Sequence, residues 1–376
     1  MFRVVIASLL ASFVSTQTPV QTPPPQQQAP PVAGQARGQG AGAAQGAAPA
    51  GQGQGRGPQT PEQIKAARDR EVEQQKATDE TWRKGSAGIM KMEKITYKSK
   101  AGGFTVPAFV FSPLQPRGPK GHPALVWVHP DIRGHVYEYY IPYVQEAVKR
   151  GYVVIAPEYR GSYGYGAEHY DAIDYGGEEV DDVTSATEYL KTMPIVDIDR
   201  VGIIGWSHGG MITLLAAERE TKMFKAVAAL VPVTNLFQRL AWNGVEQRKA
   251  QIDPQNRYGG LPQQKHDEYK RRSPIYQIDN IDVPLLVHIT KNDADVVYEE
   301  AAQLVDALRA RKPFTAETKI YEAPLGGHLF DRQYLRQGLA TDVAFYTPTN
   351  TPEQRDSWNR VWTFLDWNLR PYQGAK

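Results

Sequence analysis

The chain has 376 residues, of which 41% are hydrophobic and 22% are charged, and its formal net charge is +2. This length allows one large domain or two small ones with a sizeable core, and the near-balanced charge gives no reason to expect a nucleic acid or a membrane surface as partner. Because the chain has no cysteine, disulfides, thiolate chemistry and cysteine zinc sites are excluded.

The first residues are ordered as in a signal peptide. Arg3 precedes an apolar run over residues 4–14, and small and polar residues follow it. The run is too short to span a bilayer, which takes about 20 residues. We therefore expect residues 1–16 to be a signal peptide and the protein to be exported, either periplasmic or secreted, without a stable membrane span.

The composition changes twice before it becomes globular. Residues 17–60 are rich in Pro, Gln, Gly and Ala, and Arg37 and Arg56 are their only charged residues. Such a segment buries too little apolar surface to offset its ordering entropy, so we expect a disordered linker. Residues 61–85 are charged and favour a helix, which predicts a solvated lead-in helix. We assign residues 86–376 to one globular domain.

This globular part alternates strand-like and helix-like segments. Residues 91–98 and 104–111 alternate in polarity and flank a glycine-containing turn, which predicts an N-terminal β-hairpin. The runs that follow are typical of strands buried on both faces, and they cover residues 124–129, 152–157, 201–205, 226–232, 284–289 and 318–321. Amphipathic stretches lie between them. We predict an α/β fold with a mostly parallel central sheet and helices on both faces.

Residues 205–210, with the sequence GWSHGG, stand between a strand-like and a helix-like run. In that context the G-x-S-x-G pattern predicts a sharp strand–turn–helix connection that strains the backbone of Ser207 and exposes its hydroxyl. Gly205 and Gly209 provide the small residues needed where strand and helix converge. The pattern predicts a nucleophilic serine and therefore a hydrolase.

A serine hydroxyl needs a base to take its proton, and the base needs an acid to fix its tautomer. With this type of turn the chain order is serine, acid, histidine. Among the eight histidines only His328 lies beyond residue 290, in a glycine-rich loop. The loop after residues 284–289 offers Asp293 and Asp295. We prefer Asp293, because Asp295 is better placed to cap the next helix.

The oxyanion that develops on a substrate carbonyl needs preformed donors. We expect one donor to be the backbone N–H of His208, at the start of the helix after the serine. The second should come from the loop after the strand that ends at His129. Pro130 has no N–H, so the backbone of Ile132 or Asp131 and the side chain of His129 are the candidates, and a turn-stabilising role for His129 is the alternative.

Further stretches support this arrangement, namely GYVVIAPEYRGSYGYG at residues 151–166, VGIIGWSHGG at 201–210, RSP at 272–274, VPLL at 283–286 and the D-x-x-V pattern at 293–296. With them, residues 88–370 resemble the catalytic domain of the prolyl oligopeptidase family, within the α/β-hydrolase superfamily. The resemblance implies an α/β-hydrolase catalytic domain over residues 86–376. It also favours Asp293 as the acid and matches His328 to the family histidine.

Two departures from the family concern the substrate. Members with peptidase activity usually carry an N-terminal β-propeller that gates access, whereas a linker and one helix are expected here. The family also places a tyrosine donor where this chain has His129. Residues 129–134 look closer to the dienelactone-hydrolase type, in which a backbone amide serves. Both departures leave peptidase specificity open without affecting the triad.

A long charged insert over residues 233–282 separates two predicted strands. A connection of this length is usually functional or a local cap, so we expect it to roof the pocket and help to select the substrate. The aromatic residues that we expect to contact substrate are Phe237 and Trp242 in the insert and Trp206, Tyr159 and Tyr163 on the acyl side. The alternative is that they are ordinary core or rim residues.

We expect a serine hydrolase that cleaves peptide or acyl bonds through an acyl-enzyme, with a small molecule or a peptide as substrate. No H-E-x-x-H is present, and we expect neither a metal nor another cofactor. One alternative is a carboxylesterase or dienelactone-hydrolase-like esterase acting on small esters. A second is an inert binding module on a tether. No oligomeric state is predicted.

Overall fold

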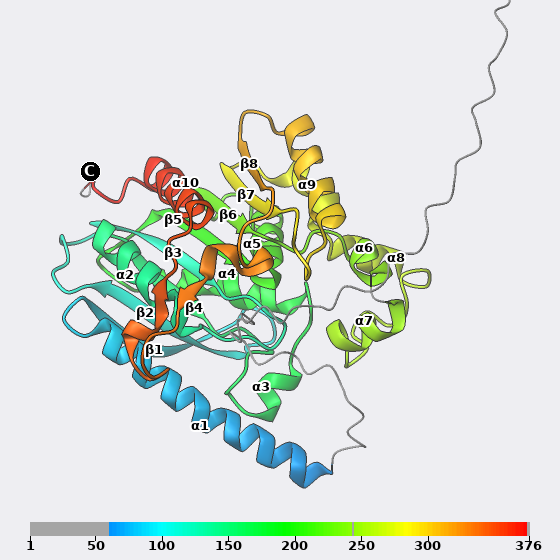
Figure 1. The fold of residues 1–376 in the computed structure, drawn as a ribbon, viewed down its shortest axis with the longest axis horizontal. Helices are drawn as coiled ribbons and strands as arrows, with labels where there is room; N and C mark the ends of the chain where they lie inside the picture. Colours follow the sequence, from blue (N-terminus) through cyan, green and yellow to red (C-terminus); the bar gives the residue numbers. More distant parts are fainter. Residues whose placement is uncertain (1–59, 243, 374–376) are drawn as a thin grey trace, which may run out of the picture. The chain divides into compact units, whose positions relative to one another are not determined.

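The computed structural model describes residues 60–242 and 244–373 (Figure 1). The expected signal peptide lies outside these residues, and so does the expected linker except for its last residue, Thr60. No helix within the described ranges has the length and apolar character needed to cross a membrane.

An eight-stranded sheet with the order β1-β2-β4-β3-β5-β6-β7-β8 forms the centre of the structure. The predicted hairpin is present, because β1 (Met90–Lys98) pairs antiparallel with β2 (Thr105–Pro113). β2 also pairs antiparallel with β4 (Val153–Pro157), and every later pair is parallel. The remaining strands are β3 (His122–Val128), β5 (Val196–Trp206), β6 (Ala226–Leu230), β7 (Leu285–Thr290) and β8 (Ala316–Tyr321). The predicted mostly parallel sheet is confirmed.

Helices cover both faces of this sheet, as predicted. Successive strand residues point to opposite faces, so Ile203 packs into one core cluster and Ile204 into the other. The first cluster includes side chains of α4 (Glu178–Lys191), α5 (His208–Arg219) and α9 (Tyr298–Arg311). The second includes those of α2 (Ile141–Arg150) and α10 (Pro352–Leu369). Both clusters are strongly apolar, which explains why the strands read as continuous apolar runs.

The helix α1 (Pro61–Ser86) occupies the residues for which a lead-in helix was expected, and a capping box between Thr60 and Gln63 starts it. The expectation that this helix is solvated is wrong for its C-terminal part. Trp82 is fully buried against Phe109 and Phe111. A single buried tryptophan in a charged helix gives almost no periodic signal, so the docking was not visible in the sequence.

Shorter elements complete the described residues. The insert between β6 and β7 folds into α6 (Leu236–Ala241), α7 (Val245–Ile252) and α8 (His266–Arg271). The others are α3 (Ala167–Asp171), the two-stranded pair β9 (Tyr334–Leu335) and β10 (Thr347–Pro348), and the 3-10 helices η1 (Glu138–Tyr140), η2 (Pro274–Tyr276), η3 (Ile278–Asn280), η4 (Gly327–Arg332) and η5 (Val343–Tyr346).

Glu218 on α5 is the one carboxyl group in the described ranges that is buried with neither oxygen hydrogen-bonded. Burial raises the pKa of Glu218 well above its usual range. The folded protein therefore keeps a proton that the unfolded chain releases above a pKa near 4.5, so this group makes the fold less stable as pH rises.

Replacing Glu218 by methionine should remove this loss of stability at high pH. We expect Glu218→Met to raise the free energy of unfolding by about 1–3 kcal/mol at pH 8 and by less at pH 4.5. Urea unfolding at both pH values measures the difference. Glu188→Met on the exposed face of α4 is the matched control and should show no such pH dependence, and a Glu218→Met protein that is less stable at pH 8 would contradict the assignment.

Candidate active site

Ser207 lies at the turn between β5 and α5, with φ 55° and ψ −119°. An L-residue reaches this conformation only when its surroundings enforce it. Here the N–H of Ser207 donates to the carbonyl of Leu230 (3.0 Å), and its own carbonyl accepts from Met211 (3.0 Å) and Val233 (3.2 Å). The strained backbone predicted from the motif is therefore present. The residue is 6% exposed, and its hydroxyl is neither hydrogen-bonded within the described residues nor among their fully buried unpartnered atoms.

The glycines of the motif are required by close packing. A Cβ on Gly205 would collide with the carbonyl of Gly209, and a Cβ on Gly209 would collide with the carbonyls of Val128 and His129 at the end of β3. A Cβ on Gly210 would lie 2.9 Å from the Cβ of Pro232. Strand, helix and neighbouring strand thus approach one another at the serine as the pattern predicts.

The proposed acid and base are directly hydrogen-bonded. His328, on η4 after β8, donates through Nδ1 to Oδ2 of Asp293 at 2.7 Å. The other oxygen of Asp293 accepts the backbone N–H groups of Asp295 and Val296, each at 2.8 Å. A carboxylate held by three hydrogen bonds fixes both the tautomer and the orientation of the imidazole, leaving Nε2 for a further partner.

Asp295, the alternative acid, donates its backbone N–H to Asp293. Its expected role as a helix cap is wrong, because Val297 precedes α9 and no side chain caps that helix. One ligand atom from each of Asp293, Asp295 and His328 lies within 4.8 Å of the others. The Asp293–His328 hydrogen bond occupies two of these three groups, so we interpret the cluster as the acid–base pair of the site.

Ser207 and His328 are not joined by a hydrogen bond within 3.5 Å in the structure. Ser207 follows β5, Asp293 follows β7, and His328 follows β8, so all three leave parallel strands at the same edge of the sheet. Active sites of open α/β sheets lie at this edge. A serine–histidine hydrogen bond is often long without substrate and tightens when substrate binds.

The first expected oxyanion donor is well placed. The N–H of His208 lies in the first turn of α5, where an amide has no acceptor within its own helix. The side chain of His208 is buried, with Nε2 at 2.9 Å from Glu179 Oε1 and Nδ1 at 3.2 Å from the carbonyl of Asp131. These contacts fix the first turn of α5 beside the loop after β3.

The side chain of His129 is turned away from the site, so it is not the second oxyanion donor. Its Nδ1 donates to the carbonyl of Pro130 (2.8 Å), and its Nε2 lies 2.9 Å from Oγ of Ser162. Complete burial lowers the pKa of His129 well below its ordinary value. The turn-stabilising alternative therefore fits this residue.

Backbone N–H groups remain as the second donor. Asp131 has φ 71°, and its carbonyl faces inward to the side chains of His208 (3.2 Å) and Tyr159 (3.4 Å). Among the described residues, neither Asp131 nor Ile132 donates its N–H to a protein acceptor. Both backbone candidates from the sequence therefore stay open.

The loop of residues 129–138 is held by two residues that the sequence did not single out. Glu158 accepts the N–H of Val136 at 3.1 Å, and burial raises the pKa of Glu158 to about 8. Trp82 of α1 donates its Nε1 to the carbonyl of Val136 at 2.9 Å. The backbone of Val136 is thus held by a residue that follows β4 and by one on α1. Both partners are distant in the sequence, so no local sequence pattern predicts these contacts.

Two aromatic residues expected at the acyl side lie in the core instead. Trp206 is fully buried, donates Nε1 to Asp331 Oδ2 (2.6 Å) and contacts Trp127. Successive strand residues point to opposite faces, so Trp206 points away from the face that Gly205 presents to α5 and into the second core cluster. Tyr159 is also fully buried, and its ring stacks on His129 with centroids 4.1 Å apart. The substrate-contact interpretation of both residues is wrong, and their alternative role as core residues is correct.

The other three aromatic residues lie outside the core. Tyr163 is half-buried and donates its backbone N–H to the carbonyl of Gly134 in the loop after β3 (2.9 Å). Phe237 of α6 is half-buried and packs within the insert, with ring centroids 5.0 Å from His266. Trp242 is 46% exposed. Their contact with a substrate stays a prediction.

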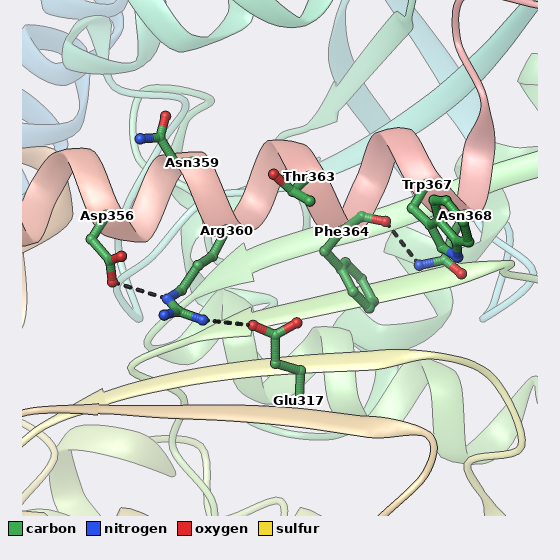
Figure 2. A pocket seen from close by; sticks show the side chains of 8 residues that line it. All are labelled: Glu317, Asp356, Asn359, Arg360, Thr363, Phe364, Trp367 and Asn368. Atoms are coloured by element: carbon green, nitrogen blue, oxygen red, sulfur yellow. Dashed lines mark hydrogen bonds and ion pairs between the residues drawn. The ribbon is translucent and has the colours of Figure 1, made fainter.

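A separate groove of about 340 Å³ lies between α10 and β8 (Figure 2). Arg360 crosses it, bonded to Asp356 (2.9 Å) and Glu317 (3.0 Å), and none of the proposed triad lines it. Its charged groups are already paired with one another. The groove therefore offers no nucleophile and no unpaired acid or base.

Comparisons with known proteins decide the family. The profile of the prolyl oligopeptidase family matches residues 139–348, more than half of the chain. The chain belongs to the prolyl oligopeptidase family. It is therefore a member of a family of serine peptidases, with the serine-hydrolase fold that the sequence predicted.

The individual relatives match this chain at low sequence identity and over only part of their own length. The chain is 30% identical over 252 residues to the uncharacterized peptidase YuxL of Bacillus subtilis, covering 64% of this chain and 36% of that protein. It is 31% identical over 169 residues to dipeptidyl-peptidase 5 of Porphyromonas gingivalis, covering 43% of this chain and 24% of that one. The structure of Pyrococcus horikoshii acylaminoacyl peptidase superposes with a TM-score of 0.58 at 19% identity, over 77% of this chain and 44% of that one. The chain thus spans less than half of each.

The two acids can be separated by a matched pair of substitutions. Asp293→Asn keeps the side-chain shape but removes the charge that orients His328, and comparable changes lower kcat by roughly 10³–10⁴-fold. Asp295→Asn leaves its backbone N–H bond to Asp293 intact and should change kcat less than about fivefold. Steady-state hydrolysis of a p-nitrophenyl ester measures both. The opposite ranking would make Asp295 the acid.

Proposed function

We propose that the protein is a serine peptidase of the prolyl oligopeptidase type that acts through an acyl-enzyme. Ser207 is the nucleophile, His328 the general base and acid, and Asp293 the residue that orients His328. The observation that carries this proposal is the 2.7 Å Asp293–His328 hydrogen bond at the sheet edge where Ser207 occupies a strained turn. No cofactor takes part in these steps.

The reaction then follows from the positions of these groups. Oγ of Ser207 attacks the substrate carbonyl while Nε2 of His328 takes its proton, and the C–O bond to the enzyme forms. The resulting oxyanion accepts hydrogen bonds from the N–H of His208 and from that of Ile132 or Asp131. The C–N or C–O bond to the leaving group then breaks, and His328 gives the proton to the departing amine or alcohol. Water next attacks the acyl-enzyme with His328 as base, the C–O bond to Ser207 breaks, and the proton returns to Oγ.

An esterase acting on small esters is the second candidate. It needs the same triad, so the fold alone does not separate the two. One observation favours it: the side chain of His129 points into the core, which leaves a backbone amide of the following loop as the second donor. This is the arrangement expected of the dienelactone-hydrolase type. The inert binding module is less well supported, because a noncatalytic domain has no need for a strained serine and an oriented imidazole.

Export of the protein is part of the same proposal and rests on the order of residues at its N-terminus. A signal peptide over residues 1–16 would place the enzyme in the periplasm or outside the cell. N-terminal sequencing of the mature protein would find a new terminus near residue 17, whereas an intact Met1 would contradict it.

The nucleophile can be tested by exchange and by labelling. Ser207→Ala should lower kcat by roughly 10⁴–10⁶-fold and abolish covalent labelling by a fluorophosphonate. Ser112→Ala, at a buried serine of β2, is the control and should label like the wild type. Labelling that persists in Ser207→Ala would overturn the assignment, and a wild-type protein that does not label would support the inert module.

Peptidase and esterase are separated by one substrate panel. Short acyl esters are compared with peptide amides that carry proline or alanine at the cleaved position, using kcat/KM. A peptidase should hydrolyse at least one amide with a kcat/KM within about 100-fold of the matched ester. Ester turnover without measurable amide turnover would favour the esterase.

A further inference from the structure

Arg239 on α6 is a buried arginine whose hydrogen-bonding groups are only partly used. It is 7% exposed, and its Nη1 donates to the carbonyl of Asp295 at 3.1 Å. Its Nε has no hydrogen-bond partner among residues 60–242 and 244–373. A guanidinium has five N–H donors, and leaving them unpaired in the interior is unfavourable. Unlike the aromatic residues of the same insert, Arg239 has no local sequence signal that points to a role at the site.

The position of Arg239 connects both halves of the active site. Asp295, which it contacts, is bonded through its N–H to the proposed acid Asp293. Tyr175 lies close enough to raise the pKa of Arg239 against the opposing effect of burial, and its ring stacks on that of His208 with centroids 4.3 Å apart. Arg239 and Tyr175 therefore lie between the acid loop and the residue that follows the nucleophile.

Further groups in this region add to the unmet hydrogen-bonding capacity. The hydroxyl of Tyr175 is buried beside the Arg239 guanidinium, but it makes no hydrogen bond of good geometry within the described part of the chain. Arg248 of α7 is half-buried, and burial followed by the charge of Arg239 lowers its pKa. Its side chain reaches Gln251, one turn along α7, at 2.9 Å. Because α7 also packs against α6, two guanidinium groups and a phenol share one region.

The carboxylates near these arginines do not supply the missing acceptors. Glu300 Oε1 accepts the N–H groups of Thr234 (2.9 Å) and Asn235 (3.4 Å). Its Oε2 lies 3.8 Å from Nη1 of Arg239, which is beyond hydrogen-bond distance. Asp295 is exposed and contacts Arg239 through its backbone carbonyl. The charge of Arg239 is partly balanced, but Nε still lacks an acceptor.

We propose that Arg239, together with Arg248 and the hydroxyl of Tyr175, forms a subsite that binds a carboxylate of the substrate. Carboxylates accept two parallel hydrogen bonds from a guanidinium, which matches the unused donors of a buried arginine. The substrate class is an acidic peptide or acyl compound, with its carboxylate on a side chain or at a peptide C-terminus. This inference rests on the proposed function, because the subsite is defined by its place beside that triad.

Binding to a catalytically inactive protein tests the subsite without requiring turnover. In Ser207→Ala, calorimetric titration compares N-acetyl-glutamate amide (side-chain carboxylate), N-acetyl-glutamine (terminal carboxylate) and N-acetyl-glutamine amide (none). At least one of the first two should bind about tenfold or more tightly than the third, since a charge-assisted hydrogen bond supplies that difference. The tighter of the two identifies the source of the carboxylate. Equal binding of all three overturns the proposal.

Replacing the arginines then shows which of them causes the preference for a carboxylate ligand. Arg239→Gln and Arg248→Gln, each combined with Ser207→Ala, should reduce that preference, Arg239→Gln to less than about threefold. Arg309→Gln is the matched control on the exposed side of α9, where the arginine bonds Thr318 at 3.0 Å, and should keep the preference. Should Arg239→Gln fail to fold by circular dichroism, Arg248→Gln decides. A preference that survives in the folded variants overturns the proposal.

The subsite and the proposed function fail in different ways. Fluorophosphonate labelling of the wild type together with equal binding of the three ligands would refute the subsite and leave the hydrolase standing. Selective binding by Ser207→Ala without labelling of the wild type would refute the hydrolase and leave the carboxylate subsite standing. Among active proteins, kcat/KM should favour a peptide with the carboxylate that the titration identifies over its matched amide by about tenfold or more.

Discussion

The close approach of β5, α5 and the end of β3 is the constraint on which the rest of the site depends. There is no room for a side chain at Gly205 or Gly209, and Ser207 between them has a φ of 55°. The strain is maintained because the N–H of Ser207 donates to Leu230 and its carbonyl accepts from Met211 and Val233, which holds the turn on both sides. A single crowded junction therefore presents the hydroxyl, the first amides of α5 and the sheet edge together.

The parts around this junction are stabilised by groups that take no part in the chemistry. Glu158 accepts the N–H of Val136, and Trp82 donates to its carbonyl, so the backbone of this residue is fixed on both sides. The amides of Asp295 and Val296 fix the carboxylate of Asp293. These hydrogen bonds are satisfied within the protein before any substrate arrives. A preorganised site of this kind has little reorganisation to complete during the reaction.

The sequence predicted what depends on short-range rules. The hairpin, the parallel sheet and the strained Ser207 follow from local polarity and glycine spacing, and the Asp293–His328 pair follows from chain order. Sequence does not show which sheet face a buried aromatic residue occupies, so it predicts Trp206 and Tyr159 beside the substrate, whereas both belong to the core. Trp82 and Arg239 act through partners more than 50 residues away, and no local pattern records such contacts.

The docking of α1 also bears on where this domain begins. The family profile starts at residue 139, and the sheet starts at Met90, yet Trp82 fills part of the core and closes a hydrogen bond beside the loop after β3. A chain shortened to begin at β1 would leave Phe109 and Phe111 uncovered and the Val136 carbonyl without its donor. The packed core of this domain therefore includes a side chain from this helix, which lies before the residues that the family profile matches.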